Sequence, residues 1–114
     1  MTVGLVIVSH SSKIADGIVE LAAQMAEGVR IVAAGGTDEG GIGTASDDGG
    51  GVVILCDLGS AILTAETALD FLDEDLRGRT VIVDAPVVEG AVAAAVAAQT
   101  GGDLEAVTVA ARTA

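Results

Sequence analysis

Four short apolar runs along the chain predict four buried β-strands. The runs cover residues 3–8, 29–34, 52–56 and 80–83. They consist mostly of Val, Ile, Leu and Ala with little alternation, which is typical of strands buried on both faces of a parallel sheet. A serine, glycine or aspartate follows each run, so each strand is expected to end there.

A helical repeat separates the first two apolar runs. Apolar residues recur at every third or fourth position between residues 14 and 25, which places them on one side of a helix. Ser11 or Ser12 can cap the start of this helix, and Gly28 is expected to close it in the left-handed conformation. His10, the only histidine of the chain, lies where the strand gives way to the helix.

Two further helices are expected after the third and fourth runs. One continues to Gly78, because Ile, Ala and Leu recur at helical spacing between residues 62 and 76. The other covers residues 87–98, with Pro86 at its start, where a missing N–H costs nothing. Residues 104–109 alternate weakly and are expected to form a short last strand.

Strands that alternate with helices predict an α/β fold. We expect an open, mostly parallel sheet of four strands plus a short C-terminal edge strand, with helices on both faces. Residues 1–114 suffice for one core and are expected to form a single domain. His10, the loop of residues 36–44 and Asp57 then lie at one edge of the sheet, which is where open α/β sheets bind ligands.

Composition and charge narrow the classes of partner. With 51% hydrophobic residues the chain is typical of a globular protein, and its apolar runs are shorter than the roughly 20 residues of a membrane span. The formal net charge of −12 argues against nucleic acid and anionic membranes as partners. No signal peptide precedes the first strand, and a single Cys cannot form an intramolecular disulfide, so we expect a cytoplasmic protein.

His10 and Asp57 are the candidate catalytic residues. Small hydroxyl residues flank His10, a helix starts directly after it, and a neutral imidazole can accept a phosphoryl group and pass it on. A carboxylate such as that of Asp57 can orient an imidazole and fix its tautomer. Asp57 can equally be a helix cap ahead of Gly59 and Ser60.

The glycine-rich loop is a candidate phosphate cradle made of backbone N–H groups and hydroxyls. It lacks the third glycine of a dinucleotide fingerprint and the Walker lysine. The candidate phosphate-binding residues are Ser11, Gly36, Thr37, Gly43, Thr44, Gly59 and Ser60.

The acidic pairs 38–39 and 47–48 are interpreted as solvated charges, because they lack the spacing of a calcium loop. One His and one Cys cannot build a zinc site, so no metal is expected. Cys56 directly follows an apolar run and is interpreted as a buried core thiol.

Three segments resemble a known family in sequence, order and spacing: GLVIVSHSSKIADGIVELAAQM, AAGGTDEGGIGT and VVILCDLGSAILTAE. Together they resemble the DhaM family. Its members are the phosphotransferase subunits of the phosphoenolpyruvate-dependent dihydroxyacetone kinase and are relatives of the mannose-type enzyme IIA domains. The resemblance covers essentially the whole chain, and GGTDEGGIGT and CDLGSA are its specific parts.

The resemblance implies that His10 is phosphorylated and that Asp57 orients it. His10 would receive phosphate from the phosphohistidine of HPr. It would pass the phosphate to ADP on the nucleotide-binding subunit of the kinase, with no permanently bound cofactor in this chain. Some relatives carry fused HPr-like and enzyme I-like domains, so this chain is expected to depend on a separate HPr. A homodimer is also expected, because mannose-type relatives are dimers and the edge strand 104–109 could pack onto a partner.

Two other classes of function stay open at this point. The chain could be a small thiol hydrolase, with Cys56 as the nucleophile and His10 as its base. It could also be a non-catalytic regulatory module that binds an anion at the loop without a covalent intermediate.

Overall fold

The computed structural model describes residues 2–35 and 47–114. The elements along the described chain are β1 (Gly4–Ser9), α1 (Ser12–Met25), β2 (Ile31–Gly35), β3 (Val52–Cys56), α2 (Gly59–Leu69), α3 (Glu74–Gly78), β4 (Thr80–Val83), α4 (Val87–Gln99) and α5 (Leu104–Arg112).

The four strands form one sheet in the order β2-β1-β3-β4, and every neighbouring pair is parallel. β1 and β3 are its central strands and are buried along their whole length. Their register runs from Gly4 opposite Val52 to Val8 opposite Cys56. The predicted α/β fold with an open parallel sheet of four strands is confirmed, and all four carboxyl ends point to the same edge.

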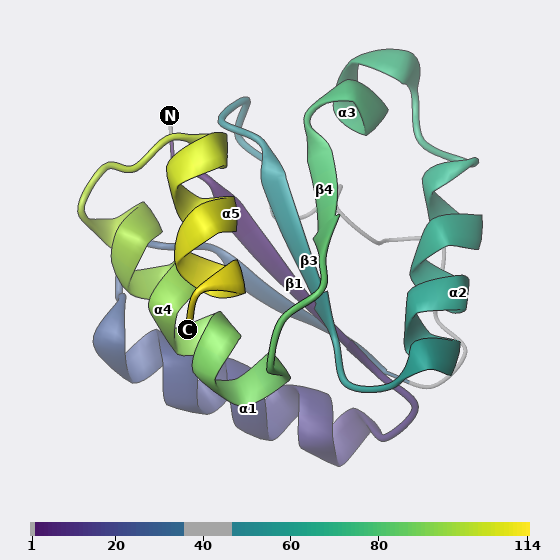
Figure 1. The fold of residues 1–114 in the computed structure, drawn as a ribbon, viewed down its shortest axis with the longest axis horizontal. Helices are drawn as coiled ribbons and strands as arrows, with labels where there is room; N and C mark the ends of the chain where they lie inside the picture. Colours follow the sequence, from purple (N-terminus) through teal and green to yellow (C-terminus); the bar gives the residue numbers. More distant parts are fainter. Residues whose placement is uncertain (1, 36–46) are drawn as a thin grey trace.

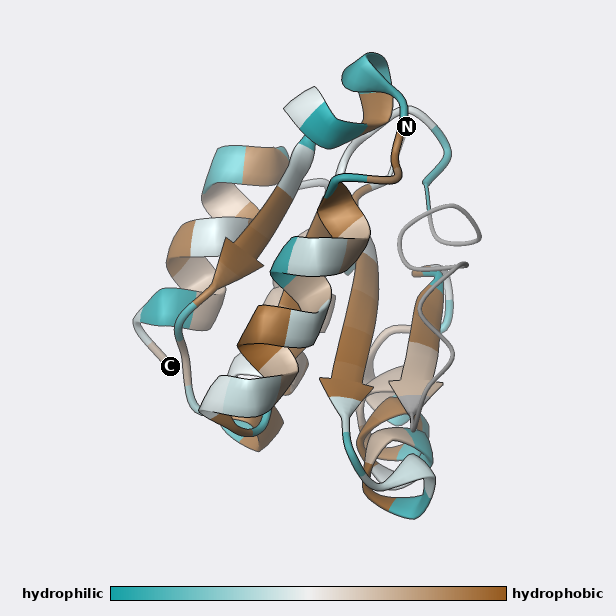
Figure 2. Cartoon of the chain, turned by 90° about the vertical axis from the view of Figure 1, so that its right-hand side faces the viewer, coloured by the Kyte–Doolittle hydropathy of each residue, from teal (hydrophilic) through white to brown (hydrophobic). Residues whose placement is uncertain are grey.

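Helices cover both faces of the sheet, as predicted (Figure 1). α1, α4 and α5 pack on one face, and α2 and α3 lie over the other. Alternate residues of β1 divide between two apolar clusters, with Leu5 and Ile7 on the α1–α4 side and Val6 and Val8 on the α2 side. The strands are hydrophobic along nearly their entire length (Figure 2), as strands buried between two helical layers must be.

The helices bury small side chains against large ones on the strands. The buried residues of α2 are Ala61, Ala65 and Ala68, and those of α4 are Gly90, Ala91, Ala94, Ala95 and Ala98. A Cβ on Gly90 would lie 3.0 Å from Leu55 Cδ2, so α4 approaches the sheet closely there. Phe71, the only aromatic residue of the chain, is 81% exposed. No helix in the described residues is both long and apolar enough to span a bilayer.

The C-terminal segment is a helix, and the predicted edge strand over residues 104–109 is wrong. Asp103 caps α5, since its side chain accepts a hydrogen bond from the Ala106 N–H at 2.9 Å. Val107 and Ala111 are fully buried at helical spacing, and α5 packs on α4, β3 and β4. The cap and this spacing outweigh the weak alternation of β-branched residues. The edge-strand argument for a dimer therefore no longer holds.

Helix ends also differ from the expectation in two places. The predicted helix up to Gly78 is divided in two, because the Asp73 side chain accepts from the Leu76 N–H at 2.7 Å and starts α3 as a separate helix. Gly28 does not close α1 in a left-handed conformation, since it has no positive φ. Ala26 is the C-cap of α1, and the Gly28 N–H donates to Gln99 Oε1 at 3.0 Å.

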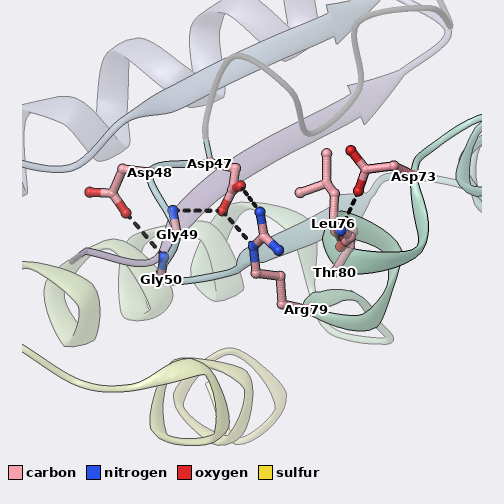
Figure 3. A network of polar contacts seen from close by, with 8 residues as sticks. All are labelled: Asp47, Asp48, Gly49, Gly50, Asp73, Leu76, Arg79 and Thr80. Atoms are coloured by element: carbon pink, nitrogen blue, oxygen red, sulfur yellow. Dashed lines mark hydrogen bonds and ion pairs between the residues drawn. The ribbon is translucent and has the colours of Figure 1, made fainter.

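A polar network holds the turn that precedes β3 (Figure 3). Arg79 donates from Nε and Nη2 to the two carboxylate oxygens of Asp47, at 3.2 and 2.6 Å. The carbonyl of Arg79 accepts from the Val52 N–H at 2.9 Å, where β3 begins. The Asp47 side chain is 10% exposed. Asp47 is therefore a structural anchor, and the interpretation of the 47–48 pair as solvated charges is wrong for this residue.

Asp47→Asn should weaken the fold at neutral pH and much less in acid. The hydrogen bond from Arg79, more than any other contact, holds the pKa of the Asp47 carboxyl below its usual range. The stabilisation is therefore present above the pKa of an unfolded aspartate, about 4, and is lost as the pH falls through the lower folded pKa. We expect a loss of about 1 kcal/mol at pH 7, a low value for a charged hydrogen bond because Arg79 stays partly exposed.

Urea denaturation between pH 7 and pH 2 measures this free energy of unfolding. Asp16→Asn is the control, because Asp16 is exposed on α1 and contributes no hydrogen bond from its side chain among the described residues. A loss in Asp47→Asn that does not change with pH would contradict the expectation.

Candidate active site

The carboxyl ends of β1 and β3 bring two polar segments together. Ser9 and Asp57 follow the last register pair, Val8 and Cys56, by one residue each. The backbone continues this pairing, since the Asp57 N–H donates to the Val8 carbonyl at 3.3 Å. The side chains meet as well, with Ser9 Oγ donating to Asp57 Oδ2 at 2.6 Å. The structure therefore places the ends of these strands at one edge, where the sequence predicted them.

His10 directly follows β1 and its side chain is exposed. Its Nε2 atom lies 2.7 Å from Ser60 Oγ, on the second residue of α2. On the other side of His10, the Ser11 side chain caps α1 and accepts from the Ile14 N–H at 3.3 Å. The histidine ring is thus accessible from solvent and contacts the start of α2.

The start of α2 has no side-chain cap. Leu58 occupies the N-cap position, and its side chain cannot accept a hydrogen bond. The first N–H groups of a helix have no partner within the helix, and they carry a partial positive charge that favours anions. Open space surrounds Gly59 where a Cβ would stand. Nε2 of His10 therefore points toward a helix start that can accept an anionic group.

Asp57 makes no hydrogen bond to the His10 ring in the described part of the chain. One carboxylate oxygen, Oδ2, accepts the Ser9 hydroxyl, and the other, Oδ1, is buried without a hydrogen-bond partner there. The contact expected between Asp57 and the ring is therefore replaced by one to Ser9. Asp57 stays near the histidine through the chain connection of Ser9 to His10.

Ser9 is a residue of this site that the sequence pattern did not predict. The signal that could have found it is a hydroxyl at the end of an otherwise aliphatic strand. Its partner could be inferred only by aligning the ends of the first and third strands.

The candidate phosphate-binding residues fall into two groups. Gly36, Thr37, Gly43 and Thr44 lie outside the described residues. Ser11, Gly59 and Ser60 lie at the starts of α1 and α2. The Ser11 N–H already donates to Ser9 Oγ at 3.0 Å and its side chain caps α1, so Gly59 and Ser60 are the stronger candidates.

Cys56 is a free, buried thiol inside the apolar cluster beneath α2. Burial raises the pKa of the Cys56 thiol to about 11, and the charges of Asp57 and Glu66 add to the effect. Thiolate is the nucleophilic form of cysteine, and little of it exists at neutral pH in such a site. This environment argues against the thiol hydrolase.

Comparison with known families shows which family this fold belongs to. The EIIA-man family, described as the PTS system fructose IIA component, matches residues 4–108. The chain belongs to the EIIA-man family. The predicted relationship to DhaM is also confirmed by curated relatives.

These curated relatives are DhaM subunits, and three of them show the range of identity and coverage. The phosphoryl donor subunit DhaM of the PEP-dependent dihydroxyacetone kinase 2 of Listeria innocua is 44% identical, over 82% of this chain and 84% of that protein. The phosphotransferase subunit DhaM of Lactococcus lactis is 33% identical, over 94% of this chain and 91% of that protein. DhaM of Providencia stuartii is 42% identical over 90% of this chain, which spans only 24% of that relative's length.

Solved structures show the same architecture. The crystal structure of EF1359, a protein of unknown function, superimposes with a TM-score of 0.81 and is 35% identical, over 99% of this chain and 95% of that one. A sigma-54 interaction domain protein from Enterococcus faecalis has a TM-score of 0.73 over 96% of this chain and 87% of that one. The latter is 16% identical and supports the fold alone.

Cys56 should react slowly with alkylating reagents in the folded protein. At pH 8 we expect iodoacetamide to modify it at least about a hundredfold more slowly than in the urea-unfolded chain, because both burial and the raised pKa suppress the thiolate. Mass spectrometry follows the reaction, and Cys56→Ala provides the blank because the chain has no other cysteine. Alkylation of the folded protein as fast as of the unfolded chain would restore the thiol hydrolase as a candidate.

Proposed function

We propose that this chain is a phosphoryl carrier of a phosphoenolpyruvate-dependent dihydroxyacetone kinase system. In this proposal His10 accepts a phosphoryl group from phosphorylated HPr and passes it to ADP on the nucleotide-binding subunit of the kinase. The observation that carries it is the exposed His10 ring with Nε2 directed at the uncapped start of α2. The identities of HPr and of the kinase subunit rest on the likeness to DhaM proteins, which are named as phosphoryl donor subunits.

The geometry favours Nε2 as the nitrogen that carries the phosphoryl group. An attacking nitrogen needs its lone pair, so the neutral ring holds its proton on Nδ1. Ser60 Oγ then donates to Nε2 in the free protein and turns aside when phosphorus approaches. As the new bond between Nε2 and phosphorus forms, the bond between phosphorus and the donor imidazole breaks, and its electron pair returns to the donor nitrogen.

The start of α2 would stabilise the transferred group. The Ser60 hydroxyl lies 2.7 Å from Nε2, and the N–H groups of Gly59 and Ser60 begin the same helix, so these three groups would be the donors to the phosphoryl oxygens. The helix start favours an anion by about 0.3–1 kcal/mol on an exposed surface. This weak stabilisation suits a carrier, because the phosphoryl group must leave again for ADP.

Accessibility and charge also fit transfer between proteins. The His10 ring is exposed, so a donor protein can reach it without opening the fold. The net charge of −12 would speed encounter with a partner that presents a basic surface. A cytoplasmic location follows from the proposed partners, and the homodimer now rests on the likeness to mannose-type domains alone.

His10→Ala should abolish phosphorylation while the fold stays intact. The test incubates the chain with labelled phosphoenolpyruvate, enzyme I and HPr, and it measures acid-labile, base-stable label. Because His10 is the only histidine, any phosphohistidine on this chain must be at this position.

Ser12→Ala is the control for this test, since Ser12 is an exposed first-turn residue of α1. Undiminished label on His10→Ala would disprove the carrier. A wild-type chain that binds phosphate without covalent label would favour the anion-binding module instead.

Asp57→Asn should slow transfer from phosphorylated HPr by roughly ten- to a thousand-fold. The substitution keeps the size of the side chain but removes the negative charge near the ring, and comparable carboxylates elsewhere contribute up to about four orders of magnitude. HPr affinity should change little, because Asp57 is partly buried whereas the His10 ring is exposed. Single-turnover kinetics measure the rate, and titration calorimetry measures affinity. A wild-type rate in Asp57→Asn would restrict Asp57 to a structural role.

A further inference from the structure

We propose that Ser9 is a positioning residue for phosphoryl transfer, because its buried hydroxyl sets the Asp57 carboxylate and the start of α1 around His10. The inference rests on the proposed function for its kinetic consequences. The contacts that carry it are Ser9 Oγ to Asp57 Oδ2 at 2.6 Å and Ser11 N–H to Ser9 Oγ at 3.0 Å.

A buried hydroxyl such as that of Ser9 is unusual in an aliphatic core strand. β1 is otherwise aliphatic apart from Gly4, and Ser9 is 2% exposed. Burying a hydroxyl costs free energy unless it is hydrogen-bonded, so alanine would be the simpler residue for packing alone. Ser9 avoids this cost by making two hydrogen bonds, and both go to residues of the site.

The direction of these two bonds is determined by the chemistry of the groups. A hydroxyl has one hydrogen, and a backbone N–H can only donate. The Ser11 N–H therefore donates to Ser9 Oγ, and Ser9 Oγ donates its hydrogen to Asp57 Oδ2. The distance of 2.6 Å is typical of a hydroxyl bound to a carboxylate.

Ser9 thereby joins three elements that meet at His10. It is the last residue of β1, its carboxylate partner directly follows β3, and its amide partner is the N-cap of α1. His10 lies between Ser9 and Ser11 in the chain, so both of its neighbours are held by the same hydroxyl. Loss of the hydroxyl would free the backbone of His10 and the Asp57 carboxylate at once.

The Asp57 carboxylate depends on Ser9 more than on any other side chain. Its second oxygen, Oδ1, is buried and has no hydrogen-bond partner within the described residues. Without the Ser9 hydroxyl, no side chain described in the structure would hold either oxygen, and the carboxylate could rotate. The charge that acts on the His10 ring would then lose its defined position.

Single-turnover transfer from phosphorylated HPr to Ser9→Ala is the first measurement. We expect the rate to fall about ten- to a hundredfold, by analogy with the loss found when a hydrogen-bond partner that orients a metal ligand is removed. Thr108→Val is the matched control, because it removes another buried hydroxyl, which donates to Leu104 O within α5, away from the site. A rate for folded Ser9→Ala within twofold of the wild type would overturn the proposal.

A double-mutant cycle with Asp57→Asn separates positioning from general destabilisation. If Ser9 acts through Asp57, Ser9→Ala should cost much less in the Asp57→Asn background than in the wild type. Full additivity of the two effects would overturn the proposal, because it would mean that the two side chains act independently.

The His10 ring gives a readout that does not depend on the proposed function. The chain has one histidine, so its two ring nitrogens give a single pair of ¹⁵N signals, whose shifts report the tautomer. Ser9→Ala and Asp57→Asn should both move these signals, and Thr108→Val should not. A wild-type chain that accepts no label would disprove the proposed carrier function. Unchanged ring signals in Ser9→Ala would disprove the positioning role of Ser9, whatever the labelling experiment shows.

Discussion

The parallel pairing of β1 with β3 determines where each polar group of the site lies. Both strands are buried on both faces, and their alternate side chains supply two separate apolar clusters. A shift of one residue would exchange the faces of a whole strand, so the register is strongly specified. Because the register ends at Val8 and Cys56, the next residues, Ser9 and Asp57, meet at the edge and direct the chain toward α1 and α2.

Polar groups at this edge are arranged in two sets. Ser9, which is buried, and Asp57, which is partly buried, form an inner set. His10 and Ser60 form an exposed set at the start of α2. The inner set is held by partly buried hydrogen bonds of the Ser9 hydroxyl, while the exposed set stays open to a second protein. The proposed carrier role would use this division, since its reactive atom must be both well placed and reachable.

Patterns of residue type were sufficient for most of the fold. The strands β3 and β4 have the predicted bounds, because their aliphatic runs end abruptly at Asp57 and Asp84. The alternation of strands and helices also placed His10 and Asp57 at one edge. The predicted strand over residues 104–109 was wrong because its β-branched residues favour a strand and the segment is too short for its period to decide, although Asp103 could cap a helix. Side-chain hydrogen-bond partners could not be predicted from the sequence, since the bonds of Ser9 to Asp57 and of Arg79 to Asp47 depend on three-dimensional register and orientation.

Alanine and glycine on the inner sides of α2 and α4 limit which substitutions this core can accept during evolution. A buried leucine or isoleucine can be replaced by a smaller residue at the cost of a cavity, but an alanine has only one methyl group that a replacement could remove. Most changes on these helices add volume and would push against residues such as Leu55, which already touches the position of Gly90. A helix residue can therefore grow only when the strand residue opposite it shrinks. Core substitutions in this protein should accordingly be fixed as compensating pairs between helix and strand, with single replacements confined to the surface.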